Sequence, residues 1–236
     1  MFALLRTTIL SLALAFGAGA ALAQDFQKGF AAYNAGDYAT ALKEWRPLAE
    51  QGDAAAQGNI GFLYENGKGV LQDYAEAVKW YRLAAEQGYA KAQFNLAVMY
   101  RKGDGVLQDY AEAMKWYRLS AEQGDAKAQL NLAMMYTNGK GVLQDYAEAV
   151  KWYRLSAEQG VAQAQNNIGV RYENGEGVLQ DNVRAHMWYN IAAANGYEKA
   201  GEWREERAGL MTSVDISKAQ SMARECMSSK YKNCGW

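Results

Sequence analysis

The glycines of this chain recur at a fixed interval, and this period limits the possible folds more than any other feature does. Four of them are spaced 36 residues apart: Gly67, Gly103, Gly139 and Gly175. The segment around the first, 66–77 (NGKGVLQDYAEA), returns at 102–113 and 138–149, and more loosely at 174–185. Such a period is typical of stacked repeats, in which no unit buries its apolar face alone. We therefore expect a stack of similar units.

One repeat, residues 54–89, predicts two helices. Residues 54–66 are rich in Ala, carry apolar side chains at helical spacing and end at Gly67, a residue type that often follows a helix C-terminus. Asp73 is placed to cap a second helix, 73–87, with Glu76 completing a capping box. Each unit is then a helix hairpin, and the fold is all-α, an α-solenoid of stacked hairpins.

Some positions of these hairpins hold a small residue in all four repeats, and others hold an aromatic residue in all four. We expect the small ones to let the helices approach closely, because a larger side chain there would cost about 1–3 kcal/mol. The aromatic ones are expected to fill the core beside them. The small positions are Ala77, Ala113, Ala149 and Ala185, with Gly61, Ala97, Ala133 and Gly169; the aromatic ones are Trp80, Trp116, Trp152 and Trp188, with Tyr64, Tyr100, Tyr136 and Tyr172.

These motifs resemble those of a known family. The unit combines an Ala-x-Ala-Gln-x-Asn helix, a Gly-x-Gly-Val-x-x-Asp loop and an Ala-x-x-Trp-Tyr helix, and it is similar to the Sel1-like repeat, a relative of the tetratricopeptide repeat. The resemblance covers about residues 37–196 and recurs four times in register. It implies that the first helix of each hairpin lines the concave side of the solenoid.

The predicted domains follow from these signals. Arg6, an apolar stretch at 9–16 and the small residues before Gln24 predict a signal peptide cleaved after Ala23, so we expect a periplasmic or secreted protein. Residues 197–236 are predicted to form C-terminal capping helices, the first of them highly charged and solvated. Between these ends lie an N-terminal capping hairpin at 24–52, a degenerate repeat, and four repeats at about 53–88, 89–124, 125–160 and 161–196.

Charge and cysteine content narrow the possible partners. Without Arg6 the chain keeps 24 basic and 26 acidic residues, well mixed, which gives no reason to expect nucleic acid. We expect no stable membrane insertion, a monomer, no cofactor and no metal site. Cys226 and Cys234 are expected to form a disulfide, as two thiols alone are too few for a metal centre.

No catalytic constellation stands out. The single histidine, His186, occupies a position that other repeats fill with apolar residues, so it is interpreted as a packed, hydrogen-bonded core residue. The Gly-x-Gly loops follow helices, not strands, and are interpreted as turns and not as phosphate sites. Some cysteine-rich Sel1-like proteins are described as binding or hydrolysing β-lactams, but these carry a cysteine pair in each repeat and this chain does not.

The repeats differ mainly on one face of the first helix. Its variable positions are spaced three, four and three residues apart, and we expect this face to lie opposite the core stripe. Its middle is apolar and basic, which suits an extended or helical peptide with acidic groups. An alternative is that these positions are merely unconstrained. The predicted groove residues are Phe62, Lys91, Phe94, Val98, Arg101, Lys127, Leu130 and Met134.

A constant asparagine shares this face, at Asn59, Asn95, Asn131 and Asn167. A ladder of amides could pair with the backbone of a bound peptide without reading its sequence. Equally, each could satisfy groups of a neighbouring hairpin. The sequence thus predicts a non-enzymatic scaffold of the bacterial envelope that binds a protein or peptide. A cell-wall or β-lactam-binding enzyme and a structural spacer are the alternatives.

Overall fold

The computed structural model describes residues 26–235, and the predicted signal peptide lies outside them. Residues 26–34 are helical and are followed by α2 (Tyr38–Glu50). The first helices of the repeats are α3 (Ala54–Asn66), α5 (Ala90–Lys102), α7 (Ala126–Asn138) and α9 (Ala162–Asn174). The second helices are α4 (Tyr74–Glu86), α6 (Tyr110–Glu122), α8 (Tyr146–Glu158) and α10 (Asn182–Ala194). The chain then forms α11 (Lys199–Ala208) and α12 (Ser213–Ser228).

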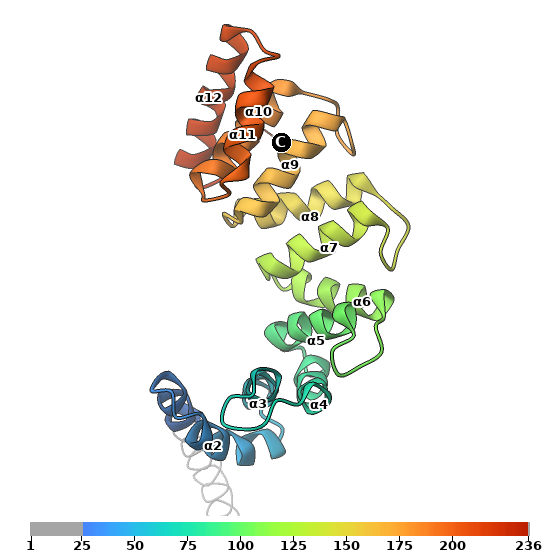
Figure 1. Cartoon of the computed structure of the whole chain (residues 1–236), viewed down its shortest axis with the longest axis vertical. Helices are drawn as coiled ribbons and strands as arrows, with labels where there is room; N and C mark the ends of the chain where they lie inside the picture. Colours follow the sequence, from blue (N-terminus) through green and yellow to red (C-terminus); the bar gives the residue numbers. More distant parts are fainter. Residues whose placement is uncertain (1–25, 236) are drawn as a thin grey trace, which may run out of the picture. The chain divides into compact units, whose positions relative to one another are not determined.

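These helices belong to two compact units, one ending at Gln108 and the other beginning at Asp109. In the first unit α2 packs on α3, α3 on α4 and α4 on α5. In the second, contacts run in order from α6 to α10, and α10 also contacts α11 and α12 (Figure 1). Within residues 26–235 the regular secondary structure is helical throughout. The predicted all-α class, with consecutive helix hairpins, is confirmed.

Local hydrogen bonds explain where the second helices begin. An aspartate accepts from the backbone N–H groups at the start of α4, α6, α8 and α10, as at Asp73, whose Oδ1 lies 2.9 Å from the Glu76 nitrogen. The capping box is only half formed. Glu76 accepts from Lys79 at 2.8 Å, while the Asp73 N–H donates to the Tyr64 carbonyl across the loop. The loop is thereby tied to the end of α3.

The second glycine of each Gly-x-Gly loop lets one hairpin touch the one before it. Gly141 has a φ of 75°, and a Cβ atom there would lie 2.4 Å from the carbonyl oxygen of Tyr110, at the start of α6. Gly69, Gly105 and Gly177 meet the preceding second helix in the same way. Such contacts leave no room for a side chain. The motif is therefore a stacking contact, which agrees with its interpretation as a turn.

The tyrosine of the second helix, and not the tryptophan, is the most constant buried aromatic residue. Tyr81, Tyr117, Tyr153 and Tyr189 are at most 2% exposed. A Cβ atom added to Gly61 would lie 2.7 Å from the ring of Tyr81, so the small residue makes room for this ring. Trp80 and Tyr64 are only half-buried. The expectation that the tryptophans fill the core is thus correct for Trp116 and Trp188, which are buried, and only partly correct for Trp80, which packs against the core but stays half-buried.

A buried glutamine links each repeat to the helix before it. Gln129 is 4% exposed, and its Nε2 donates to the Ala121 carbonyl, at the end of α6, over 3.1 Å. Its Oε1 accepts from Gln159 at 2.8 Å, one helix further along. Gln57, Gln93 and Gln165 donate in the same way to the preceding helix. These amides add a side-chain hydrogen bond to carbonyl groups at helix ends, which also accept from the backbone N–H of the following glycine, as Ala121 does from Gly124.

The N-terminal elements form a hydrophobic cluster of their own with α3. Trp45 of α2 is 2% exposed and packs with Ile60 and Leu63 of α3. Its indole N–H donates to the carbonyl of Phe26 over 3.2 Å, and Gly29 lies so close that a Cβ atom would meet the indole at 2.5 Å. Residues 26–50 therefore cover the end of the first repeat with aromatic side chains.

The charged helix α11 is less solvated than expected. Arg207 donates to Glu173, and Arg204 donates to Asn190 over 3.0 Å, so both arginines face the hairpin of α9 and α10. Cys226 and Cys234 form the predicted disulfide, a bond typical of proteins from oxidising compartments. Across residues 26–235 no helix has the length and apolar character needed to cross a membrane.

Candidate functional site

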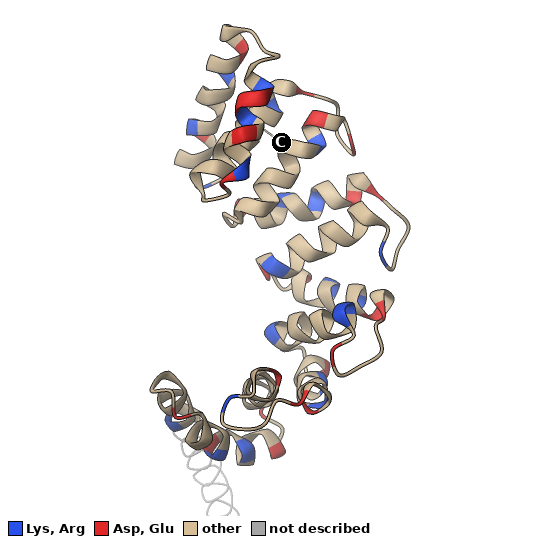
Figure 2. Ribbon diagram, viewed as in Figure 1, with Lys and Arg blue, Asp and Glu red and all other residues tan. Residues whose placement is uncertain are grey.

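Most of the predicted groove residues lie on the solvent side of the first helices. In the first unit, Lys91 is exposed, and Phe62, Phe94, Val98 and Arg101 are partly exposed. In the second unit, Lys127 is exposed and Met134 is partly exposed, with its sulfur 4.0 Å from Gln163 Nε2. Basic and acidic residues are interspersed along the ribbon of both units (Figure 2). Each unit therefore presents apolar and basic side chains on the solvent side of a first helix.

Leu130 departs from this arrangement. It is only 8% exposed, and Asn166 at the equivalent position is 2% exposed. In the first repeat this position is Gly58, where a Cβ atom would lie 2.9 Å from the ring of Tyr89. The position therefore faces the next hairpin, and the expectation that the whole variable face lies opposite the core is wrong at this point. Leu130 contributes to packing between repeats.

Two of the four asparagines face a tyrosine of the preceding hairpin. Burial is the main cause that raises the pKa of Tyr81 above its ordinary range, followed by Glu65, whose carboxylate accepts from the hydroxyl at 2.5 Å. Asn95 opposes this rise as a hydrogen-bond partner of the same hydroxyl. Asn167 likewise opposes the rise that burial causes in the pKa of Tyr153, as a hydrogen-bond partner of its hydroxyl. These amides support the contact between successive repeats.

The other two asparagines are placed differently. Asn131 donates from Nδ2 to the Lys127 carbonyl of its own helix over 2.8 Å. Asn59 lacks the equivalent tyrosine, because the residue 36 positions before Tyr81 is Trp45, and the indole N–H of Trp45 is already bonded to Phe26. Within residues 26–235 the Asn59 side chain has no hydrogen-bond partner. The ladder is therefore not uniform, and among the described residues its first member alone keeps a free amide.

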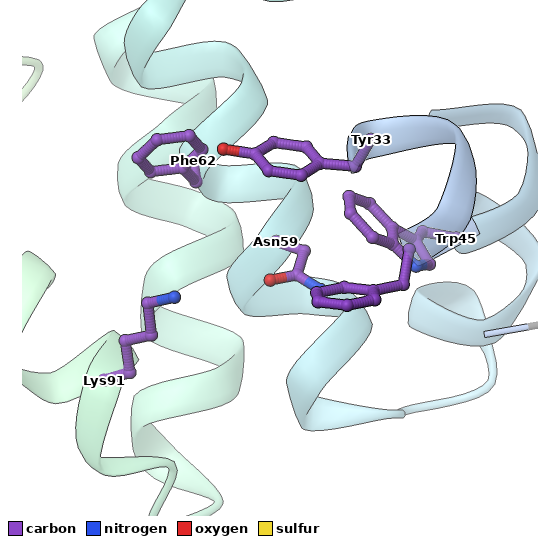
Figure 3. A pocket seen from close by; sticks show the side chains of 6 residues that line it. Tyr33, Trp45, Asn59, Phe62 and Lys91 are labelled. Atoms are coloured by element: carbon purple, nitrogen blue, oxygen red, sulfur yellow. The ribbon is translucent and has the colours of Figure 1, made fainter. Parts of the chain in front are cut away.

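A cavity of about 90 Å³ lies beside Asn59, between the N-terminal helices and the first helices of two repeats. Figure 3 shows Tyr33, Phe62 and Trp45 around one side, with Asn59 between them and Lys91 reaching in from α5. Phe30, which is 48% exposed, completes the lining. None of the six lining side chains is acidic.

The aromatic walls of this cavity are held in place from outside. Tyr33 contacts the rings of Trp45, at 5.9 Å, and Phe62, at 6.2 Å. The ammonium group of Lys68 lies over the rings of Tyr33, Tyr38 and Phe62, at 5.3, 4.7 and 5.2 Å from the ring centroids. Such cation–π contacts with several rings fix their orientation. The cavity is therefore preformed.

The sequence identifies only half of this cavity. Asn59, Phe62 and Lys91 belong to the predicted groove, whereas Phe30, Tyr33 and Trp45 come from the capping hairpin and were not predicted. A signal is visible when the repeats are compared, because Trp45 stands one period before Tyr81, where a tyrosine would be expected. Because of this difference, Asn59 lacks the tyrosine hydroxyl that Asn95 and Asn167 face.

The residues considered for catalysis are placed elsewhere. His186 is 2% exposed, in agreement with its assignment to the core, but its Nδ1 has no hydrogen-bond partner, so the expected hydrogen bond is not found at that atom. Burial, with a smaller effect from Arg204, lowers the pKa of His186. Among residues 26–235 no three His, Cys, Asp or Glu side chains cluster as metal ligands would.

Comparison with known proteins gives a consistent result. The Sel1 repeat family matches residues 54–89, 90–125, 126–161 and 162–197. No curated protein matches the chain.

Among solved structures, the chain is similar to c5321, described as a protective antigen of uropathogenic Escherichia coli strains with an SLR fold, at 35% identity and a TM-score of 0.77. The match covers 91% of this chain and 46% of c5321, so the chain spans less than half of that protein.

A Sel1 repeat protein from Oxalobacter formigenes is 36% identical with a TM-score of 0.75, over 88% of this chain and 83% of that one. A putative Sel1 repeat protein from Klebsiella pneumoniae, at 21% identity and a TM-score of 0.51, shares the fold over 79% of this chain and 93% of that one. With four family matches that together cover more than half of its length, this chain belongs to the Sel1 repeat family.

Proposed function

We propose that this protein is a non-enzymatic scaffold that binds peptide segments of a partner protein along the exposed faces of its first helices. The observation that carries the proposal is the combination of exposed lysines and partly exposed apolar side chains on α5 and α7, at Lys91, Val98, Lys127 and Met134. On each of these helices an apolar side chain lies two turns from a lysine, and this combination suits a peptide with apolar and acidic residues.

The assignment to the bacterial envelope is part of the same proposal. It rests on the leader-like segment 1–23 and on the disulfide between Cys226 and Cys234, since disulfides persist mainly in oxidising compartments. The c5321 protein of similar fold is described as a protective antigen, which is a property of that protein. It is compatible with an exported role here.

Selection from a display library of random peptides tests the binding role. We expect enriched peptides that combine apolar and acidic residues and that lose affinity for the double variant Lys91→Glu with Lys127→Glu. The matched control is Lys43→Glu with Lys218→Glu, which makes the same charge change at exposed lysines on α2 and α12. Retained binding by the first double variant, or no enriched peptides at all, would contradict the proposal.

The absence of catalysis is proposed together with binding and has its own measurement. Incubation with the chromogenic β-lactam nitrocefin is expected to give no turnover. Turnover that is abolished by a single substitution in the chain would overturn the non-enzymatic assignment and favour the alternative of a β-lactam-binding enzyme.

A further inference from the structure

The cavity beside Asn59 is set apart by the elements that build it. Its wall is formed by residues 26–50, which precede the first repeat, and its floor includes the only asparagine of the ladder that has no hydrogen-bond partner among the described residues. An unpaired amide next to apolar walls has both donor and acceptor capacity left for a ligand. The cavity is therefore a place in this unit where a ligand can gain hydrogen bonds without displacing existing ones.

The aromatic lining indicates which side chain the cavity takes. The ring of Tyr33 lies 5.9 Å from that of Trp45 and 6.2 Å from that of Phe62, and Phe30 stands partly exposed in the lining. Rings arranged in this way pack well against a further ring, in edge-to-face or offset contacts that contribute roughly 0.5–1.5 kcal/mol beyond the buried area. An aromatic side chain is the occupant that this geometry favours.

The charges around the cavity indicate which residue of the ligand stands next to its aromatic side chain. Lys91 lines the cavity, is exposed and has no acidic partner within residues 26–235, while Lys68 lies behind two of the rings. The charged groups of Lys91 and Lys68 are both positive, and the lining contains no carboxylate. A carboxylate on the ligand, next to its ring, would complement Lys91.

We propose that this cavity, formed by Phe30, Tyr33, Trp45, Asn59, Phe62 and Lys91, binds an aromatic side chain of a peptide at a position directly adjacent to an acidic residue. This proposal rests on the proposed peptide-binding function and adds its anchor residue. The ring packs against the side chains of Phe30, Tyr33 and Phe62, the amide of Asn59 pairs with the peptide backbone, and Lys91 pairs with the neighbouring carboxylate.

The test is an NMR titration of the purified protein with the blocked peptide acetyl-Gly-Phe-Asp-Gly-amide. We expect shifts of the Trp45 indole N–H and the Asn59 side-chain amide. The peptide with Ala in place of Phe should give no shifts, and the peptide with Asn in place of Asp should bind roughly two- to fivefold more weakly, as expected for an exposed ion pair.

Protein variants separate the two contributions. Phe30→Ala should weaken binding by about tenfold, the effect of removing one wall of an anchor pocket. Lys91→Gln should remove the preference for Asp over Asn. The matched controls are Lys218→Gln, at an exposed lysine of α12, and Leu71→Ala, an apolar residue that is 90% exposed away from the cavity. Both controls should bind the peptide like the parent protein.

The outcomes distinguish this proposal from the broader one. If display-selected peptides bind but shift resonances of α5 and α7 and leave Trp45 and Asn59 unchanged, the cavity assignment is wrong and the scaffold function stands. If the Phe peptide binds no better than the Ala peptide, or Phe30→Ala binds normally, the cavity assignment is likewise overturned. If neither the selected peptides nor the Phe peptide binds, both proposals fail.

Discussion

His186 is a single polar residue in a buried stripe that the other repeats fill with Val78, Met114 and Val150. Burial lowers its pKa below the ordinary value of 6.5, and the positive charge of Arg204 adds to this effect, while Glu205 opposes it. In the unfolded chain the imidazole takes up its proton at higher pH than in the folded protein. As the pH falls through 6.5, protonation therefore favours the unfolded state until the folded pKa is also passed.

The stability of the protein should accordingly fall between about pH 7.5 and pH 5, and part of this fall should disappear in His186→Met. The variant restores the residue type found at Met114. Urea denaturation at several pH values measures the difference. Parallel curves of stability against pH for the parent protein and the variant would show that His186 contributes nothing to the pH dependence.

Gln129 shows how a single buried amide supports the stack. It donates to the Ala121 carbonyl and accepts from Gln159, so Gln129→Ala removes two buried hydrogen bonds. We expect a loss of about 1–3 kcal/mol in the free energy of unfolding. Gln220→Ala, at an exposed position of α12, is the control and should change stability by less than about 0.5 kcal/mol. Equal effects of the two substitutions would refute this role.

Two loop glycines allow the cost of backbone conformation to be measured separately from the cost of a contact between helices. Gly141 has a φ of 75° and touches the Tyr110 backbone, whereas Gly124, between α6 and α7, has a φ of 92° and open space where a Cβ atom would lie. Both replacements by Ala impose the strain of a left-handed conformation, about 1–2 kcal/mol. Only Gly141→Ala also forces two elements apart.

Gly141→Ala should therefore destabilise the protein by about 1–3 kcal/mol more than Gly124→Ala, the usual cost of overpacking. Thermal or urea unfolding of the two variants measures this difference directly. A similar loss for both would mean that the second glycine of the loop matters for its backbone conformation alone and not for contact with the preceding hairpin.

Across the whole molecule, repeat proteins respond locally because each unit contacts only its neighbours. The Cys226–Cys234 bond joins α12 to the following residues, and α12 packs on α10. Replacing both cysteines by serine should cost roughly 2–3 kcal/mol on the chain-entropy model. Hydrogen exchange should accelerate in α12 and α10, with residues up to Gln108 unchanged. Faster exchange throughout the chain would contradict this local response.

The sequence alone predicts five features: the period, the helix hairpins, their aspartate caps, their glycine ends and the cysteine pair. These features depend on residues within a few positions of one another, or on repetition that is visible in the chain itself. Asp73, for example, caps α4 through a group only three residues away. The fold class was therefore predictable almost completely, and about half of the candidate cavity with it.

Which of these residues touch one another became known only from the folded chain. Tyr81 is fully buried while Trp80 is only half-buried, Leu130 is buried, and residues of the capping hairpin reach the cavity beside Asn59. Such contacts join side chains that are far apart in the sequence, and their geometry depends on how ring shapes and small residues fit together across helices. Periodicity identifies equivalent positions, but packing determines which of them keeps a free polar group. At Asn59 that group lies beside an aromatic cavity.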